Sequence, residues 1–188
     1  MSTGTARGTA HRAGTEQALV VAIGNPLRRD DGVGPQVVAR ALELSTAERL
    51  SEALNVMGPL SAPLDLFDLW SGWTGLTIVV DSVRSGAPVG ELSLSYFGPD
   101  RPPPWLCRWS NVVNALAVGH RPSTHGLGVA EVFAILAGMG RAPLHVLLVG
   151  VEGEDFSNGE GLTPAVCAAV EGGAALVLDL VRAWHFRE

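Results

Sequence analysis

The chain has 188 residues, of which 47% are hydrophobic and 17% charged, which is enough apolar sequence to bury the core of one domain. Its formal net charge of −6 gives no reason to expect a nucleic acid or an anionic membrane as partner. Gly, Pro or charged residues interrupt every apolar stretch, so we expect no membrane span. The spacing of Cys107 and Cys167 fits no zinc or redox motif, which indicates free thiols in a reducing cytoplasm.

Residues 1–17 are rich in Ser, Thr, Gly and Arg and contain no apolar core. This composition predicts a disordered leader and not a signal peptide. Residues 18–188 are predicted to form a single α/β domain.

The first predicted strand covers Ala18 to Ile23, an apolar, β-branched run that stops abruptly at Gly24-Asn25-Pro26. A glycine-rich loop with two adjacent carboxylates, Asp30 and Asp31, follows it. From Val33 to Leu44 the apolar residues recur at helical spacing. The order strand, acidic loop, helix puts the loop at the carboxyl end of a strand, where open α/β sheets bind their ligands.

Two interpretations of this acidic loop stay open on sequence alone. Asp30 or Asp31 could simply cap the following helix while the glycines make the turn. Alternatively, the carboxylates bind a cation. A phosphate-binding loop is a weak third idea, because two carboxylates repel a phosphate.

Residues 54–57 form a short candidate strand that ends at Gly58-Pro59, and residues 62–70 form a short amphipathic helix. Leu76 to Val80 is a clear buried strand that leads into Asp81-Ser82. A carboxylate at the end of such a strand is costly unless it is paired or binds something. The alternative is that Asp81 caps the next turn.

Residues 91–97 alternate polar and apolar side chains, which predicts an antiparallel strand near a sheet edge. The Pro- and Trp-rich segment 98–110 is a predicted loop whose aromatic rings either meet a partner or cover the core. Residues 111–118 are predicted as a short helix.

His125 directly precedes Gly126-Leu127-Gly128 and a predicted helix that starts at Val129. A lone His at such a place is usually a cap or a surface residue. His120 is a weaker candidate ligand, and His145 opens a buried strand, 145–151, at the end away from the expected ligand edge. An acidic loop, 152–161, leads to the last helix, in which Thr163 is the expected N-cap and Pro164 the first helical residue.

Strands and helices alternate, with about five strands. The predicted fold is a three-layer α/β/α sandwich with a mostly parallel, twisted sheet.

Three motifs in this order go beyond the general fold: Gly24-Asn25-x-Leu27-x-x-Asp30-Asp31-Gly32-x-Gly34, Asp81 after Ile-Val-Val, and Thr124-His125-Gly-Leu-Gly. Together they resemble the hydrogenase maturation endopeptidases, and the likeness extends to Val149-Gly150-Val151 and Gly161-Leu162-Thr163-Pro164. This family removes a C-terminal extension from the precursor of a nickel-iron hydrogenase large subunit after nickel insertion.

The resemblance implies that Asp31, Asp81 and His125 are both the metal ligands and the catalytic residues. It also implies nickel supplied by the substrate's active site, the large-subunit precursor as partner, and a monomer. Two carboxylates and an imidazole suit a divalent first-row metal and leave positions open. Activation of a water and activation of the scissile carbonyl remain equal alternatives.

The chain departs from the family pattern where Gly58-Pro59-Leu60 replaces a Gly-Gly-Thr-like turn, and where residues 96–121 are longer and richer in Pro and Trp. A non-catalytic nickel-sensing or chaperone-like protein that binds the precursor is the alternative function. A small-molecule hydrolase or phosphorylase-like enzyme is a third hypothesis. The chain contains neither a G-x-S-x-G nor an H-E-x-x-H motif.

Overall fold

A six-stranded sheet runs through the part of the chain that the structure, a computed structural model, describes: residues 17–70, 73, 75–99, 102–109, 113–114 and 128–186. The strands are β1 (Ala18–Ile23), β2 (Leu54–Leu60), β3 (Leu76–Val83), β4 (Leu92–Phe97), β5 (Val113–Asn114) and β6 (His145–Glu152). Their order across the sheet is β2-β1-β3-β6-β4-β5. Only the β4–β6 pair is antiparallel among these neighbours, so the prediction of a mostly parallel sheet is confirmed.

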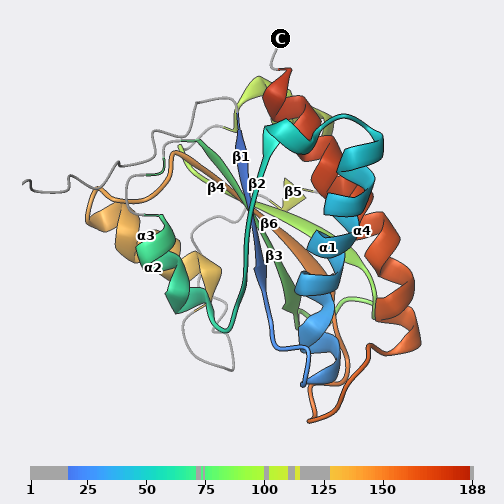
Figure 1. Cartoon of the computed structure of the whole chain (residues 1–188). Coiled ribbons are helices and arrows are strands. Elements are labelled where there is room, and N and C mark those ends of the chain that lie inside the picture. The colour runs from blue at the N-terminus through green and yellow to red at the C-terminus, as the bar shows by residue number, and fades with distance from the viewer. Residues whose placement is uncertain are drawn as a thin grey trace, which may run out of the picture.

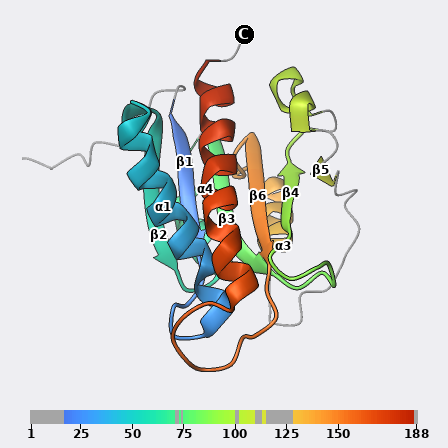
Figure 2. The ribbon, with the colours of Figure 1, turned by 90° about the vertical axis from the view of Figure 1, so that its right-hand side faces the viewer.

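Helices cover both faces of this sheet (Figure 1). α1 (Val33–Ala47) and α4 (Pro164–His185) lie on one face, and Figure 2 shows them side by side in front of the strands. α2 (Leu66–Leu69) and α3 (Val129–Gly138) lie on the other face. Four short 3-10 segments complete the described elements: η1 (Arg29–Gly32), η2 (Ser51–Ala53), η3 (Pro63–Asp65) and η4 (Pro104–Trp109). The predicted three-layer α/β/α sandwich is therefore confirmed.

Strand β1 shows why the sheet must be covered twice. Its even-numbered residues, such as Val20, pack into the core beneath α1 and α4, and its odd-numbered residues, such as Val21, pack into the core beneath α2 and α3. All six residues of β1 are buried. A continuous apolar run of this kind is what a parallel strand between two helical layers requires.

Several local expectations need correction. Strand β2 continues through Gly58-Pro59 to Leu60, and Val113–Asn114 pair with β4 as a strand where a helix was predicted. The rest of that predicted helix lies outside the described residues, as do residues 1–16 and His120. In the Pro- and Trp-rich segment, Leu106 and Trp109 are buried, so these side chains cover the core.

Helix α4 is long and apolar enough to cross a membrane by length and composition alone, with a mean hydropathy of 1.7, although the sequence was expected to contain no membrane span. Its residues Val177, Leu180 and Val181 are fully buried in the core that α4 shares with α1 and the sheet. Core helices of this kind satisfy the same length and hydropathy test.

His145, which opens β6, is a structural residue as predicted. Its Nδ1 lies 2.8 Å from the Tyr96 hydroxyl, and its ring packs edge-on against Trp184. Burial raises the pKa of Tyr96 to about 12, so this hydroxyl keeps its proton at neutral pH. The cluster lies at the amino end of β6, opposite the edge where β1 and β3 end.

Gly34 lets the first turn of α1 lie directly against the ends of β1 and β3. A Cβ at this position would come within 2.3 Å of the Ile23 carbonyl oxygen and 2.6 Å of the Val80 carbonyl oxygen. Both contacts are with backbone, which cannot move aside cheaply.

We therefore expect Gly34→Ala to lower the free energy of unfolding by at least about 2 kcal/mol, measured by urea denaturation. Gly138→Ala is the matched control, because a Cβ there meets nothing within 4 Å. It should leave stability unchanged or raise it by up to about 1 kcal/mol. Equal effects of the two substitutions would contradict this close approach of α1 to the sheet.

Candidate functional site

The loop between β1 and α1 is folded around Asn25. The side-chain oxygen of Asn25 accepts a hydrogen bond of 2.9 Å from the Leu27 amide. The backbone carbonyl of Asn25 accepts one of 3.0 Å from the Arg28 amide. Gly24 precedes it with a φ of +134°, and a Cβ there would lie 1.9 Å from the Asp31 carbonyl oxygen. Only glycine fits this turn, which brings the end of the loop back beside its beginning.

Asp31 points back over this turn toward β3. One of its carboxylate oxygens accepts a 3.0 Å hydrogen bond from the Asn25 amide, and the other lies 3.4 Å from the Ser82 hydroxyl. Neither Asp30 nor Asp31 caps α1, because the N-cap is Gly32 and no side chain bonds the first turn. The capping interpretation of the acidic loop is therefore wrong.

Asp81 lies in β3, the strand next to β1, one residue after the pair of Ala22 and Val80. It sits inside the strand, two residues before the last one, where the sequence predicted it directly after the strand. The pKa of Asp81 is raised to about 7, mainly by burial and further by the nearby negative charge of Asp31. A hydrogen bond from the Ser82 amide lowers this pKa and offsets part of the increase. The structure thus brings Asp31 and Asp81 close enough to repel each other.

The third predicted ligand, His125, lies outside the described residues. Within the described part of the chain, no three His, Cys, Asp or Glu side chains form a group that could hold a metal. The described helix after His125, α3, begins as predicted at Val129, with Gly128 as its N-cap. The two carboxylates fit a divalent cation in the type of their oxygen donors, and the assignment of His125 remains a prediction.

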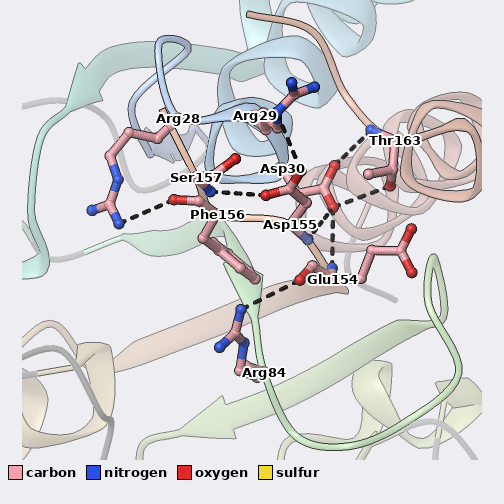
Figure 3. Close-up of polar contacts among 9 residues, drawn as sticks. All are labelled: Arg28, Arg29, Asp30, Arg84, Glu154, Asp155, Phe156, Ser157 and Thr163. Carbon is pink, nitrogen blue, oxygen red and sulfur yellow. Dashed lines mark hydrogen bonds and ion pairs between the residues drawn. The ribbon is translucent and has the colours of Figure 1, made fainter. Parts of the chain in front are cut away.

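Asp30 turns away from Asp31 and is fully buried. Figure 3 shows its carboxylate facing the loop that leads into α4. It accepts hydrogen bonds from the amides of Glu154 (3.0 Å), Asp155 (3.1 Å) and Thr163 (2.7 Å), and from the Thr163 hydroxyl (3.1 Å). Burial alone would raise the pKa of Asp30, but these donors together bring it below its usual value.

Further contacts join the same two loops. The Arg29 amide donates to the Gly159 carbonyl at 2.9 Å, and the Gly159 amide donates to the Leu27 carbonyl at 2.9 Å. The Asp30 amide donates to the Asp155 carbonyl at 3.0 Å. The Arg29 side chain forms an ion pair of 3.2 Å with Asp155. The acidic loop after β1 is therefore held along most of its length by the loop after β6.

The guanidinium groups at this edge contact the loop after β6 (Figure 3). Arg28 donates to the Phe156 carbonyl at 3.2 Å, and Arg84 donates to the Glu154 carbonyl at 3.4 Å. The Arg84 guanidinium also stacks 4.5 Å from the centre of the Phe156 ring.

Glu152, the last residue of β6, is a second buried carboxylate that the sequence analysis did not single out. It accepts hydrogen bonds of 2.8 to 2.9 Å from the amides of Ser85 and Gly86 and from the Ser85 hydroxyl. These bonds fix the turn that follows β3, at the residues four and five positions after Asp81. Its only signal in the sequence is a charged residue at the end of a buried run, the same signal that identified Asp81.

No family model matches the chain. It is 30% identical over 165 residues to the hydrogenase expression/formation protein HupD of Thiocapsa roseopersicina, and the match covers 82% of this chain. The chain spans 66% of the length of that curated relative.

Two solved structures share the fold. The hydrogenase maturating endopeptidase HybD from E. coli superposes with a TM-score of 0.61 at 23% identity, over 88% of this chain and 92% of that one. The [NiFe] hydrogenase maturation protease HycI from Thermococcus kodakarensis gives a TM-score of 0.60 at 20% identity, over 90% and 95%. At these identities the structural likeness shows the fold.

The fold and the site define an α/β protein with two carboxylates at the carboxyl edge of a mostly parallel sheet. The chain is thus similar in sequence to a hydrogenase expression/formation protein and shares the fold of hydrogenase maturation endopeptidases, which agrees with the resemblance seen in its motifs.

The raised pKa of Asp81 predicts a characteristic dependence of stability on pH. Its folded-state pKa of about 7 exceeds the unfolded value of 3.8, so the folded protein holds a proton that the unfolded chain has lost between these values. Stability must therefore fall as pH rises through this window. Asp81→Asn removes the effect, and we expect it to stabilise the metal-free protein at pH 8 by on the order of 1–3 kcal/mol.

The measurement is urea denaturation of wild type and Asp81→Asn at pH 5 and pH 8, with a chelator present. The advantage of the variant should be larger at pH 8. The same advantage at both values would mean that Asp81 is not protonated in the folded protein.

Proposed function

We propose that this chain is an endopeptidase that removes a C-terminal extension from the precursor of a nickel-iron hydrogenase large subunit once nickel has been inserted. The observation that carries the proposal is the proximity of Asp31, in the loop after β1, to Asp81 in the neighbouring parallel strand β3. The raised pKa of Asp81 supports it, because two carboxylates that repel each other gain most from a shared cation. The likeness to HupD, HybD and HycI supports a role in hydrogenase maturation, and the motif resemblance suggests the large-subunit precursor as substrate.

In this proposal nickel arrives as part of the substrate, held in the active site of the precursor. Asp31 and Asp81 supply oxygen ligands, and His125 supplies an imidazole from the segment before α3. Bound nickel would act as a Lewis acid that aligns and polarises the reacting groups. The chain's own contribution is to hold Asp31 on the Asn25 amide and the Ser82 hydroxyl, so that the carboxylate needs little rearrangement when the precursor binds.

The alternative is a non-catalytic protein on the same scaffold that binds nickel-loaded precursor and leaves it intact. Both functions need Asp31 and Asp81, so the described geometry favours neither over the other. We also propose, from the relationship to the family, that the protein acts as a monomer in the cytoplasm.

The proposal predicts cleavage of nickel-loaded precursor only. We expect the intact mass of the precursor to fall by the mass of a C-terminal peptide when it is incubated with this protein, and nickel-free precursor to stay unchanged. Asp31→Asn, Asp81→Asn and His125→Ala should each slow processing by at least about 100-fold, since each removes a metal ligand.

The matched control is Asp179→Asn, because Asp179 lies far along α4 in a surface ion pair with Arg182 and should not affect the rate. Stable binding of the precursor without loss of mass would favour the non-catalytic alternative. Cleavage of both precursor forms would keep the protease and reject nickel recognition.

A further inference from the structure

We infer that Thr163, at the start of α4, is a positioning residue for the carboxylate site and acts on Asp31 through Asp30. The assignment of Asp31 as a metal ligand rests on the proposed function, but the coupling of Thr163 to the position of Asp31 does not. Thr163 lies 132 residues after Asp31 in the sequence, and neither local spacing nor the strand pattern connects them.

The first step is the unusual use of the Thr163 hydroxyl. A threonine at an N-cap ordinarily accepts a hydrogen bond from an amide in the first turn of its own helix. Here Thr163 is the N-cap of α4 and makes no such bond. Its hydroxyl instead donates to Asp30 at 3.1 Å, beside a 2.7 Å bond from its own amide to the same carboxylate. Thr163 thus gives two donors to Asp30.

The second step is that Asp30 has no freedom to move while these donors are present. Its carboxylate is fully buried and also receives the amides of Glu154 and Asp155. Hydrogen bonds to a buried charge are among the stronger ones, because an unpaired donor or carboxylate in the interior is costly. The carboxylate therefore anchors the acidic loop to the start of α4.

The third step links the anchor to the site. Asp31 is the next residue, in the same short turn, and its amide donates to Arg28 at 3.1 Å while its carboxylate accepts from the Asn25 amide. Loss of the hydrogen bonds to Asp30 would free the peptide unit that joins Asp30 and Asp31 to turn, and this movement would draw the Asp31 carboxylate away from the Asn25 amide. The Asn25 amide is therefore a direct reporter of where Asp31 lies.

The test measures hydrogen exchange of the Asn25 amide by NMR in wild type, Thr163→Val, Thr163→Ser and Asp30→Asn. Thr163→Val keeps the shape and the backbone donor but removes the hydroxyl, and we expect Asn25 to exchange about 3-fold to 10-fold faster. Thr163→Ser restores the hydroxyl and should restore the wild-type rate. Asp30→Asn places an amide nitrogen against amide donors, so its effect should exceed that of Thr163→Val.

Two controls separate positioning from general loss of stability. The amide of Ile78 in the centre of β3 should exchange at the wild-type rate, since only a local opening is expected. Glu160→Gln changes an exposed carboxylate in the same loop after β6 and should affect neither amide.

The same variants tested on nickel-loaded precursor should lower kcat in the same order while KM stays constant, because positioning of a ligand affects the reaction more than binding of the partner.

Equal Asn25 exchange in Thr163→Val and Thr163→Ser would overturn the inference, whether or not Asp30→Asn folds. An equal increase in the hydrogen-exchange rates of the Asn25 and Ile78 amides would show that Thr163 only stabilises the fold and does not position Asp31. If wild type fails to process the precursor, the proposed function falls and the exchange data still decide the role of Thr163.

Discussion

The buried carboxylate of Asp30 is the interaction on which the rest of the site depends. A charge removed from water must be surrounded by donors, and here three backbone amides and one hydroxyl surround it. These donors come from the loop after β6 and from the start of α4, whereas Asp30 belongs to the loop after β1. One residue thus joins three parts of the chain at the carboxyl edge of the sheet, and the Asp31 carboxylate is presented from the fixed turn that results.

The buried charges described at this edge of the sheet are balanced except between Asp31 and Asp81, which is why we propose a cation there. Asp30 and Glu152 are buried carboxylates that accept hydrogen bonds from amides and hydroxyls of the surrounding loops. The nearby arginines hold the loop after β6: Arg28 and Arg84 donate to its carbonyls, and Arg29 pairs with Asp155. The negative charge of Asp31 contributes to the raised pKa of Asp81, so the two carboxylates repel each other.

The sequence predicts the sheet well because its parallel strands are buried on both sides and read as uninterrupted apolar runs, as in β1. It also singles out Asp81, since a carboxylate at the end of such a run stands out, whereas the choice of Asp31 came from the family resemblance. It could not separate the roles of the adjacent residues Asp30 and Asp31, because that choice depends on contacts with Thr163, Glu154 and Asp155, more than 120 residues away. The helix predicted over residues 111–118 fails at Val113–Asn114 for a similar reason, since pairing with β4 overrides local preference.

The departure from the family pattern at Gly58-Pro59-Leu60 can now be located. This segment ends the edge strand β2, where Gly58 and Pro59 are exposed, and the Leu60 carbonyl accepts a 3.0 Å hydrogen bond from the Gly24 amide at the base of the acidic loop. The altered residues therefore border the carboxylate loop through its backbone and contribute no side chain to Asp31 or Asp81 among the contacts described. A change at such a border leaves Asp31 and Asp81 unchanged and alters the surface beside them, so under the proposed function it would bear first on which precursor is recognised and less on the chemistry.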